Sequence, residues 1–284
     1  MKMLAITCFA ICGMSAMAEE LTVDQIMTRV AENQDRAQEM RGAFLYNQKV
    51  QARFNRANGK LAREEKLEYQ VAPKPNGVEK KLTHFEGKYE RKGKFVEYDK
   101  PGEHYKGLDV DGDLIRDMVN DMTGDKESKD GVARDLFPLT CEEQGGYNFT
   151  LEGKETYHGR EVYRVSFRPK EHVSLVDADE GEANWKGYAL IDAEEFQPLV
   201  VNTKLATHIP TAVKVLLGTD IKGLGFSVSY QKFDEGLWFP VSYGGEFYVR
   251  AVFFYKRHMS ISMVNSGFER ALVTSHVAYD TSGK

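Results

Sequence analysis

The feature that most constrains the fold of this chain is a two-residue alternation of apolar and polar side chains, which recurs in many short segments. Between Phe44 and Phe54, for example, Tyr46, Val50 and Ala52 alternate with polar neighbours. A period of two places the apolar residues on one face of a β-strand. Turn signals rich in glycine, proline and asparagine separate the segments. The sequence therefore predicts many antiparallel strands joined by short turns.

These segments give an explicit strand prediction. We expect strands near residues 43–54, 63–71, 79–85, 94–99, 147–152, 160–168, 187–192, 198–207, 226–234, 237–243, 246–255, 258–264 and 270–279. The turn signals between them include Asn58-Gly59, Glu86-Gly87, Gly153, His158-Gly159 and Gly244-Gly245. The residues from Arg63 to Lys66 are charged on both faces of their strand, so we expect this part of the sheet to be wet or at an edge.

Three segments have helical spacing instead. Residues 22–25, Thr-Val-Asp-Gln, form a capping box, which predicts a helix from Val23 to Arg41 with one narrow apolar stripe. Apolar residues from Leu114 to Met122 predict a short amphipathic helix, followed by a mobile loop. In the segment from Ile209 to Gly218, Pro210 suits a first helical turn and Gly218 suits the stop. We expect this third segment to cover the sheet.

The beginning of the chain indicates export. Lys2 is followed by an apolar stretch to about Met14, and Ala16-Met17-Ala18 is a small-x-small cleavage pattern. The apolar stretch is shorter than the about 20 residues that span a bilayer. We therefore expect a signal peptide over residues 1–18, a mature chain of one domain over 19–284, and a periplasmic location. Thr7 and Ile11 precede the two cysteines of this segment, so lipid modification is not expected.

Charge and cysteine content exclude some classes of function. The formal net charge is −5, and basic residues are mixed with acidic ones, which is unlike a nucleic-acid-binding protein. The mature chain would keep only Cys141, so no internal disulfide can form. A lone thiol without a matching motif is typically a small buried residue, and we expect Cys141 to be dispensable for function.

Motifs for catalysis or for cofactors are missing from the sequence. The string Asp109-Val110-Asp111-Gly112-Asp113 resembles the start of a calcium loop, but Leu114 stands where that loop needs glycine and Asn120 where it needs glutamate. We interpret the string as a solvated turn before the short helix. The histidines have no metal-ligand spacing, and no nucleophile elbow or phosphate loop occurs. We expect no catalytic residues, no metal and no cofactor.

Several strings resemble those of a known group of proteins. They are residues 153–163, Gly-Lys-Glu-Thr-Tyr-His-Gly-Arg-Glu-Val-Tyr; residues 187–192, Gly-Tyr-Ala-Leu-Ile-Asp, with Pro198-Leu199 six residues further on; and residues 236–240, Gly-Leu-Trp-Phe-Pro. This pattern resembles the outer-membrane lipoprotein-sorting superfamily, which includes LolA-like and LolB-like carriers and a regulator of envelope stress. The resemblance covers most of residues 20 to 280.

The resemblance implies a mainly β (α+β) fold. A strongly curved antiparallel sheet would form an incomplete barrel, covered by the N-terminal helix and short helices. In that superfamily the concave apolar face receives acyl chains. The strings also have local structural interpretations, because Gly159 permits a tight turn, Asp192 can cap the turn after its strand and Pro198 can begin an edge or bulged strand.

The leading hypothesis is a non-catalytic binding protein that holds a lipid, an acyl chain or a lipidated partner in an apolar cavity, possible roles being lipoprotein or lipid sorting. A half-barrel has more inner face than a few short helices can fill. The candidate lining residues share strand faces or lie in the third helical segment. They are Phe44, Tyr46, Phe54, Tyr163, Phe167, Phe226, Tyr230, Phe239, Tyr243, Val213, Leu216 and Leu217.

Two alternatives stay open at this stage. An envelope signalling or scaffold protein could use the same fold for contact with another protein, through a sheet edge or a loop. A hydrolase could assemble its site from distant residues that no sequence pattern reveals. Release of a ligand by organic extraction favours the first hypothesis, whereas capture of an envelope protein without ligand favours the second.

Overall fold

The computed structural model describes residues 20–74, 77–102, 109–123, 137–170, 185–206, 219–233, 236–251 and 255–271. The expected signal peptide, the segment from Ile209 to Gly218 and the loop after the second predicted helix lie outside these residues. Within the described part of the chain, no helix is both long enough and apolar enough to cross a membrane.

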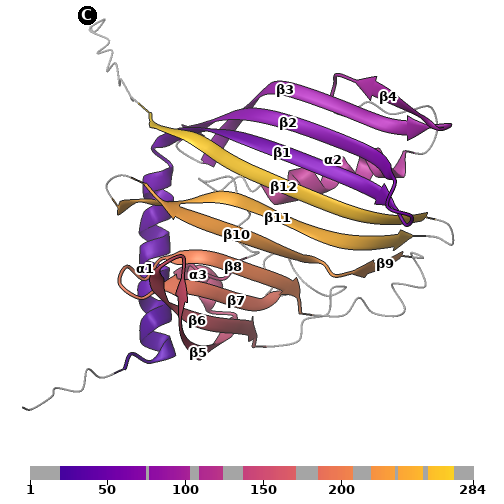
Figure 1. Cartoon of the computed structure of the whole chain (residues 1–284). Helices are drawn as coiled ribbons and strands as arrows, with labels where there is room; N and C mark the ends of the chain where they lie inside the picture. The colour runs from indigo at the N-terminus through magenta and orange to yellow at the C-terminus, as the bar shows by residue number, and fades with distance from the viewer. Residues whose placement is uncertain are drawn as a thin grey trace, which may run out of the picture.

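The fold is a large antiparallel sheet that is accompanied by a long N-terminal helix and two shorter helices (Figure 1). The helices are α1 (Val23–Arg41), α2 (Val110–Thr123) and α3 (Cys141–Gln144). The strands are β1 (Phe44–Arg56), β2 (Leu61–Lys74), β3 (Gly77–Arg91), β4 (Lys94–Tyr98), β5 (Tyr147–Tyr157), β6 (Arg160–Pro169), β7 (Trp185–Asp192), β8 (Pro198–Leu205), β9 (Thr219–Lys222), β10 (Gly225–Lys232), β11 (Trp238–Ala251) and β12 (Tyr255–Arg270). The mainly β prediction is confirmed.

The strand order explains how distant parts of the sequence meet. Eleven strands follow the order β4-β3-β2-β1-β12-β11-β10-β8-β7-β6-β5, and β9 pairs with β11 beside this path. The last strand, β12, thus lies between β1 and β11 and joins the N-terminal meander to the central one. In this order β4 and β5 are the two ends, so the sheet is open and not closed into a barrel.

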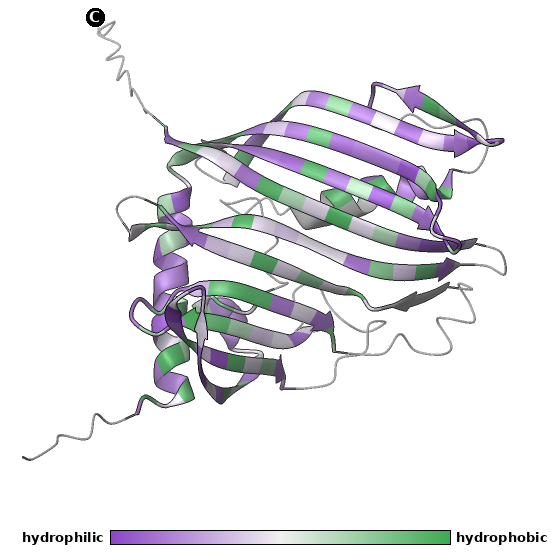
Figure 2. Cartoon of the chain, viewed as in Figure 1, coloured by the Kyte–Doolittle hydropathy of each residue, from purple (hydrophilic) through white to green (hydrophobic). Residues whose placement is uncertain are grey.

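The alternation in β1 is confirmed residue by residue. Tyr46, Val50, Ala52 and Phe54 are buried, and so is Gln48 between them. The polar residues between these positions are exposed or half-buried. Figure 2 shows the same striping of apolar and polar residues along most of the strands. One face of the sheet is therefore the apolar one, as the period of two predicts.

Two of the three helix predictions are confirmed, one of them with a changed boundary, and the third lies outside the described residues. The capping box at the start of α1 forms as expected: Gln25 N donates to Thr22 Oγ1 at 3.3 Å, and Thr22 N donates to Gln25 Oε1 at 2.9 Å. The helix ends at Arg41, as predicted. The second helix begins at Val110, four residues before the predicted apolar run, because Asp109 caps it by accepting a hydrogen bond from Gly112 N at 3.1 Å.

Three of the predicted turns are wrong, since their glycines lie inside strands. The Gly244-Gly245 pair does not separate two strands but lies in the middle of β11, and Gly87 lies within β3. A Cβ at Gly244 would meet the carbonyl oxygen of Ile261, and one at Gly87 would meet the ring of Tyr98. Gly153 lies at a register shift within β5. Glycine inside a strand commonly marks such close approaches and bulges, so the dipeptide alone misled the prediction.

Further strand boundaries also differ. β11 extends from Trp238 to Ala251 as one strand, where two strands, 237–243 and 246–255, were expected. β12 is longer than the predicted strand 258–264, and most of the predicted strand 270–279 lies outside the described residues. β9 was not predicted. It is only four residues long and shows no alternation in the sequence that would reveal it.

Candidate binding site

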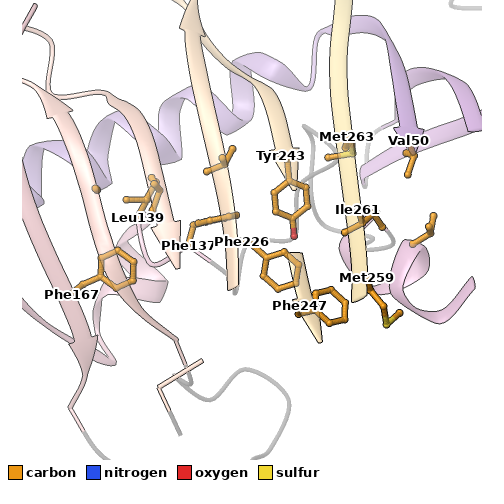
Figure 3. Close-up of a cluster of buried hydrophobic side chains, with 14 of the residues drawn as sticks. Val50, Phe137, Leu139, Phe167, Phe226, Tyr243, Phe247, Met259, Ile261 and Met263 are labelled. Atoms are coloured by element: carbon orange, nitrogen blue, oxygen red, sulfur yellow. The ribbon is translucent and has the colours of Figure 1, made fainter. Parts of the chain in front are cut away.

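The principal apolar cluster lies on one face of the sheet and crosses strands from both of its halves. We call this face, with the cluster on it, the inner face. Figure 3 shows its central part, with Phe137 beside Phe226 of β10 and Tyr243 of β11, and with Met259, Ile261 and Met263 of β12 beyond them. The buried strand residues of the cluster are Val50, Ala52, Phe54, Leu67, Tyr147, Tyr163, Val165, Phe167, Ala189, Ile191, Val201, Phe226, Val228, Tyr243, Phe247, Val249, Tyr255, Met259, Ile261 and Met263.

Two helices pack on the inner face. Ile26, Met27 and Val30 of α1 belong to the cluster, and so do Ile115 and Val119 of α2. α1 crosses the sheet near one end of the strands, whereas α2 lies behind the strands around β1 (Figure 1). The helices therefore cover different parts of the inner face.

The centre of the inner face is covered by a segment without helical structure, which precedes α3. The ring of Phe137 packs edge-on against the ring of Tyr243, with 5.7 Å between the centroids. Tyr243 in turn contacts Phe226 at 5.8 Å, and Phe226 contacts Trp185 at 5.5 Å. Leu139 belongs to the same cluster. The described residues of this segment, 137–140, are all buried, and Leu139 N donates to the carbonyl oxygen of Phe137 at 2.7 Å.

Methionine contributes to the lining of the same region. Met259 and Met263 are fully buried on β12, beside Ile261, and Met27 of α1 belongs to the same cluster. Methionine side chains are unbranched and flexible, so they adapt to apolar partners of different shape. The centre of the inner face is thus made of adaptable side chains under Phe137 and Leu139.

The sequence-predicted lining residues fall into three groups. Phe54, Tyr163, Phe167, Phe226 and Tyr243 are brought together in the inner-face cluster, and Tyr230 packs at its border. Phe44 and Phe239 belong to a separate cluster with Ala37 and Met40 of α1, and Tyr46 contacts the ring of Phe239 at 6.3 Å. Val213, Leu216 and Leu217 lie outside the described residues.

A β-bulge lies between Phe239 and Tyr243. Ser229 pairs with Ser242 and Tyr230 pairs with Pro240, so Val241 is left over in β11. Pro240 is itself a signal for such an irregularity, because proline cannot donate to the ladder. Phe239 still contacts Tyr46, which shares the apolar face of β1 with Val50, and it packs beside Ala37 of α1.

A buried group of charges attaches the start of α2 to the sheet. Arg63 of β2 is fully buried, and its Nη1 donates to Asp109 Oδ2 at 2.5 Å. Its Nε donates to Glu65 Oε1 at 3.0 Å and to the hydroxyl oxygen of Tyr98 at 2.8 Å. Gly112 makes this packing possible, since a Cβ there would lie 2.7 Å from Arg63 Nη1.

Burial fixes the role of Tyr98 in this group. Burial, together with the hydrogen bond to Glu65, raises the pKa of the Tyr98 hydroxyl well above its usual value. The hydroxyl therefore stays protonated and donates to Glu65 Oε1 at 2.5 Å. The guanidinium of Arg63 and this hydroxyl together satisfy the buried carboxylate.

A second charged contact attaches Asp111, near the start of α2, to β12. Asp111 of α2 accepts a hydrogen bond from the Tyr255 hydroxyl at 2.6 Å. It also accepts hydrogen bonds from Arg257, which include Nε to Oδ1 at 2.9 Å and Nη2 to Oδ2 at 3.0 Å. The bidentate geometry is the stronger form of an arginine–carboxylate pair.

Two sequence interpretations are therefore wrong. The Asp109 to Asp113 string is not a solvated turn, because Asp109 and Asp111 are 2% and 7% exposed. The strand around Arg63 is neither wet nor at an edge, since β2 lies between β1 and β3 and its charges are paired. One signal for these contacts is local, namely two carboxylates two residues apart at the start of a helix, but their basic partners lie far away in the chain.

The strings that resemble the lipoprotein-sorting superfamily converge on one corner of the fold. Asp192 Oδ1 accepts hydrogen bonds from Glu194 N and Glu195 N, which confirms that Asp192 caps the turn after β7. Arg160 donates to Asp192 Oδ2, and the indole nitrogen of Trp238 donates to Glu195 Oε2 at 3.1 Å. These residues hold turns together, so the strings carry structural information.

Cys141 differs from its expected environment. It is exposed at the first position of α3, not buried. A hydrogen bond with Asp35, burial and the charges of Asp35 and Glu32 raise the pKa of its thiol. A raised pKa lowers the thiolate fraction and hence nucleophilicity. The expectation that Cys141 is dispensable stays a prediction.

In the described part of the chain, no group of three or more histidine, cysteine, aspartate or glutamate side chains is arranged to hold a metal ion. The carboxylate of Asp109 instead accepts a hydrogen bond from Arg63, and that of Asp111 accepts one from Tyr255. Within those residues, the arrangement supports binding of an apolar molecule on the inner face.

Comparison with known proteins gives structural matches only. No family model matches the sequence, and no curated protein matches it. Among solved structures, the LolA superfamily protein NE2245 from Nitrosomonas europaea has a TM-score of 0.36 and 12% identity, over 89% of this chain and 96% of that one. A lipoprotein-sorting protein domain from Vibrio parahaemolyticus has a TM-score of 0.36 and 9% identity, over 86% and 93% of the two chains.

The LolA superfamily is thus represented among these matches. The Mycobacterium tuberculosis lipoprotein LppX also matches, with a TM-score of 0.27 and 7% identity over 89% of this chain and 100% of that one. TM-scores of this size establish neither membership of a family nor a function for this chain. The residues of the inner face carry the functional proposal instead.

Proposed function

We propose that the protein is an exported, non-catalytic binding protein of the cell envelope. It forms one domain after removal of residues 1–18, and it holds an acyl chain, as part of a lipid or of a lipidated protein, on the inner face. The ligand lies along β10, β11 and β12, under the segment that contains Phe137 and Leu139.

The observation that carries this proposal is that the apolar face is larger than the helices that cover it. Eleven strands at about 4.8 Å spacing, with about eight residues each, make a face of about 1,200 Å². α1 and α2, with 19 and 14 residues and a width of about 10 Å, cover about 500 Å² of it. The remaining area needs a further apolar cover, from other parts of the chain or from a bound molecule.

The chemistry of the centre favours an acyl chain over a polar ligand. Phe226, Met259, Ile261 and Met263 present only carbon and sulfur atoms, and the ring of Tyr243 packs among them, whereas the buried charges of Arg63, Asp109 and Asp111 hold the start of α2 on the sheet. A flexible hydrocarbon chain gains from apolar burial without needing directed hydrogen bonds, at about 0.8 kcal/mol per buried CH₂.

A photoreactive fatty acid tests both the binding and the site. Purified mature protein is incubated with a diazirine-labelled acyl chain, irradiated and digested, and the labelled peptides are identified by mass spectrometry. We expect labels on β10, β11 and β12 and on the segment around Phe137, and competition by unlabelled fatty acid. Labels that are confined to the outer face, or no competable labelling at all, would contradict the proposal.

The alternative of a scaffold protein makes a different prediction in the same material. Extraction of the natively purified protein with organic solvent should release a lipid if the acyl-chain proposal is correct. A protein that yields no lipid and takes up no acyl probe, yet captures an envelope protein, would support the scaffold function instead.

A further inference from the structure

One end of the sheet collects basic side chains from six neighbouring strands. Beyond the paired row of Tyr89, Arg63, Phe54, Met259 and Phe247, the described ends of β1 to β4, β11 and β12 carry eight lysine or arginine residues and a single acidic one, Glu90. The eight are Arg56, Lys60, Arg91, Lys92, Lys94, Arg250, Lys256 and Arg257. These strand ends lie along one edge of the molecule in Figure 1.

Two of the eight are neutralised by carboxylates. Arg56 pairs with Glu90, and Arg257 pairs with Asp111. The other six are exposed, and none of them takes part in the ion pairs found between described side chains. Asp220 of β9 stands opposite Arg250 in the ladder with β11. We call these six residues the basic rim: Lys60, Arg91, Lys92, Lys94, Arg250 and Lys256.

The basic rim stands out against the rest of the molecule. The chain as a whole has a net charge of −5, so the positive charge of the rim is a local feature that the overall charge does not predict. On the outer face of the same strands, basic residues are paired across strands, as in Lys49 with Glu68 and Lys66 with Glu86. Six strands at about 4.8 Å spacing make the rim about 24 Å wide.

The two most exposed of the large apolar side chains in the described residues lie at this same end. Phe95 is 51% exposed and directly follows Lys94 at the tip of the β3–β4 hairpin. Tyr248 is 58% exposed and stacks on His258, its partner across β11 and β12, two residues from the Arg250–Lys256 pair. Exposed aromatic rings among lysine and arginine are the composition that surfaces use at the headgroup region of a membrane.

We propose that the basic rim docks the protein on an anionic phospholipid surface, with Phe95 and Tyr248 at the level of the headgroups. The net negative charge of the molecule opposes a general attraction to such a surface, so the local rim also sets the orientation. Docking in this orientation brings the end of the sheet that holds the α2 anchor, Arg257 with Asp111, against the membrane. The proposal does not depend on acyl-chain binding, which is tested separately.

Flotation with lipid vesicles tests the docking. The mature protein is mixed with vesicles of phosphatidylcholine, with or without phosphatidylglycerol, at low and at physiological salt. We expect binding only to the vesicles with phosphatidylglycerol, and weaker binding as salt rises, because counterions screen the rim charges. No binding to anionic vesicles at low salt would overturn the proposal.

Charge variants locate the docking surface. The triple variant Arg91→Gln, Lys92→Gln, Lys94→Gln should weaken partitioning on the order of 100-fold, at about fivefold for each base removed. The matched control Lys74→Gln, Lys81→Gln, Lys100→Gln changes the net charge equally at exposed positions away from the rim. An equal loss in both variants would show a non-local attraction and would overturn the assignment of the rim.

A tryptophan placed at the hairpin tip reports the depth of contact. In Phe95→Trp, brominated phosphatidylglycerol should quench the fluorescence more than it does in the parent protein, whose tryptophans Trp185 and Trp238 are not at the rim. Absence of added quenching would place the tip away from the bilayer. The triple variant should still take up the acyl probe in solution, so a failure of docking and a failure of ligand binding give different results.

Discussion

At the scale of single residues, the main result is that charged side chains are buried for structural reasons. Arg63 lies between Asp109, Glu65 and Tyr98, and it joins three separate segments of the chain. Such a group gives little net stability when compared with apolar packing, but removal of one member leaves a buried charge without compensation. Its function is to fix where α2 lies on the inner face.

The substitution Arg63→Met tests this role. It should lower the free energy of unfolding by about 3–5 kcal/mol, because Asp109 and Glu65 would remain buried without their cation. The control Arg53→Met removes an arginine that pairs with Glu64 but is half-exposed, and it should cost less than about 1 kcal/mol. Urea unfolding of both variants measures the difference. Equal losses would mean that the buried group does not anchor α2.

A second residue-scale prediction concerns pH. Burial of Glu64 would raise its pKa, but hydrogen bonds from Lys88 and Gln51 and the charges of Lys88 and Arg53 outweigh burial and hold its pKa below 4.5. A carboxylate whose pKa is lower in the folded state stabilises the fold above the unfolded pKa. That contribution is present above about pH 4.5 and is lost as the pH falls through the folded pKa.

The variant Glu64→Gln should therefore be less stable than the parent protein near neutral pH, and the difference should shrink below pH 4.5. Urea unfolding at a series of pH values measures it. Glu68→Gln, at a more exposed pair with Lys49, serves as the control. A difference that stays constant from neutral to acidic pH would show that the charge of Glu64 has no part in its contribution.

At the scale of elements, the sheet depends on irregularities that its own glycines and prolines permit. Gly187 of β7 lies so close to β8 that a Cβ would meet the carbonyl oxygen of Asn202. Gly245 of β11 lies in the same way against Gly225 of β10. Together with the bulge at Val241, these close approaches let adjacent strands bend around the inner face.

At the scale of elements, one prediction concerns the segment from Ile209 to Gly218. We propose that it covers part of the inner face, because its apolar residues Val213, Leu216 and Leu217 form a surface too large to leave in water. Leu216→Asp would place an unpaired charge against that face, at a cost of several kcal/mol if buried. Uptake of a fluorescent acyl probe should weaken while the β signal in circular dichroism is retained. Unchanged uptake would argue against a cover at this position.

At the scale of the whole molecule, the two ends of the sheet differ in their charge. The open sheet presents an apolar inner face, the charged anchor of α2 lies toward one end of it, and the basic rim lies at that same end. An acyl ligand on the inner face and a membrane at the rim would then meet at one place.

For the whole molecule, we predict where the mature protein begins. Cleavage after Ala18 should leave Glu19 as the first residue, since Ala16-Met17-Ala18 is the small-x-small site after the apolar stretch. Intact-mass analysis of periplasmic material checks it. Protein that retains Met1, or that carries a covalent lipid, would contradict both the cleavage and the expected location.

The sequence alone determined the features that depend on local physics. The alternation in β1, the capping box at Thr22, the end of α1 at Arg41 and the turn capped by Asp192 are each set by residues near one another in the chain. The mainly β fold follows from them, because amphipathic strands must share an apolar face.

The tertiary structure decided the rest. Gly87 and Gly244 look like turn residues until the neighbouring strands are in place, and Asp109 and Asp111 look solvated until Arg63 and Arg257 arrive from distant strands. The same applies to the bulge at Val241, which only pairing with β10 creates. Burial of a charge, close approach of two backbones and register are properties of pairs far apart in sequence, and no local pattern encodes them.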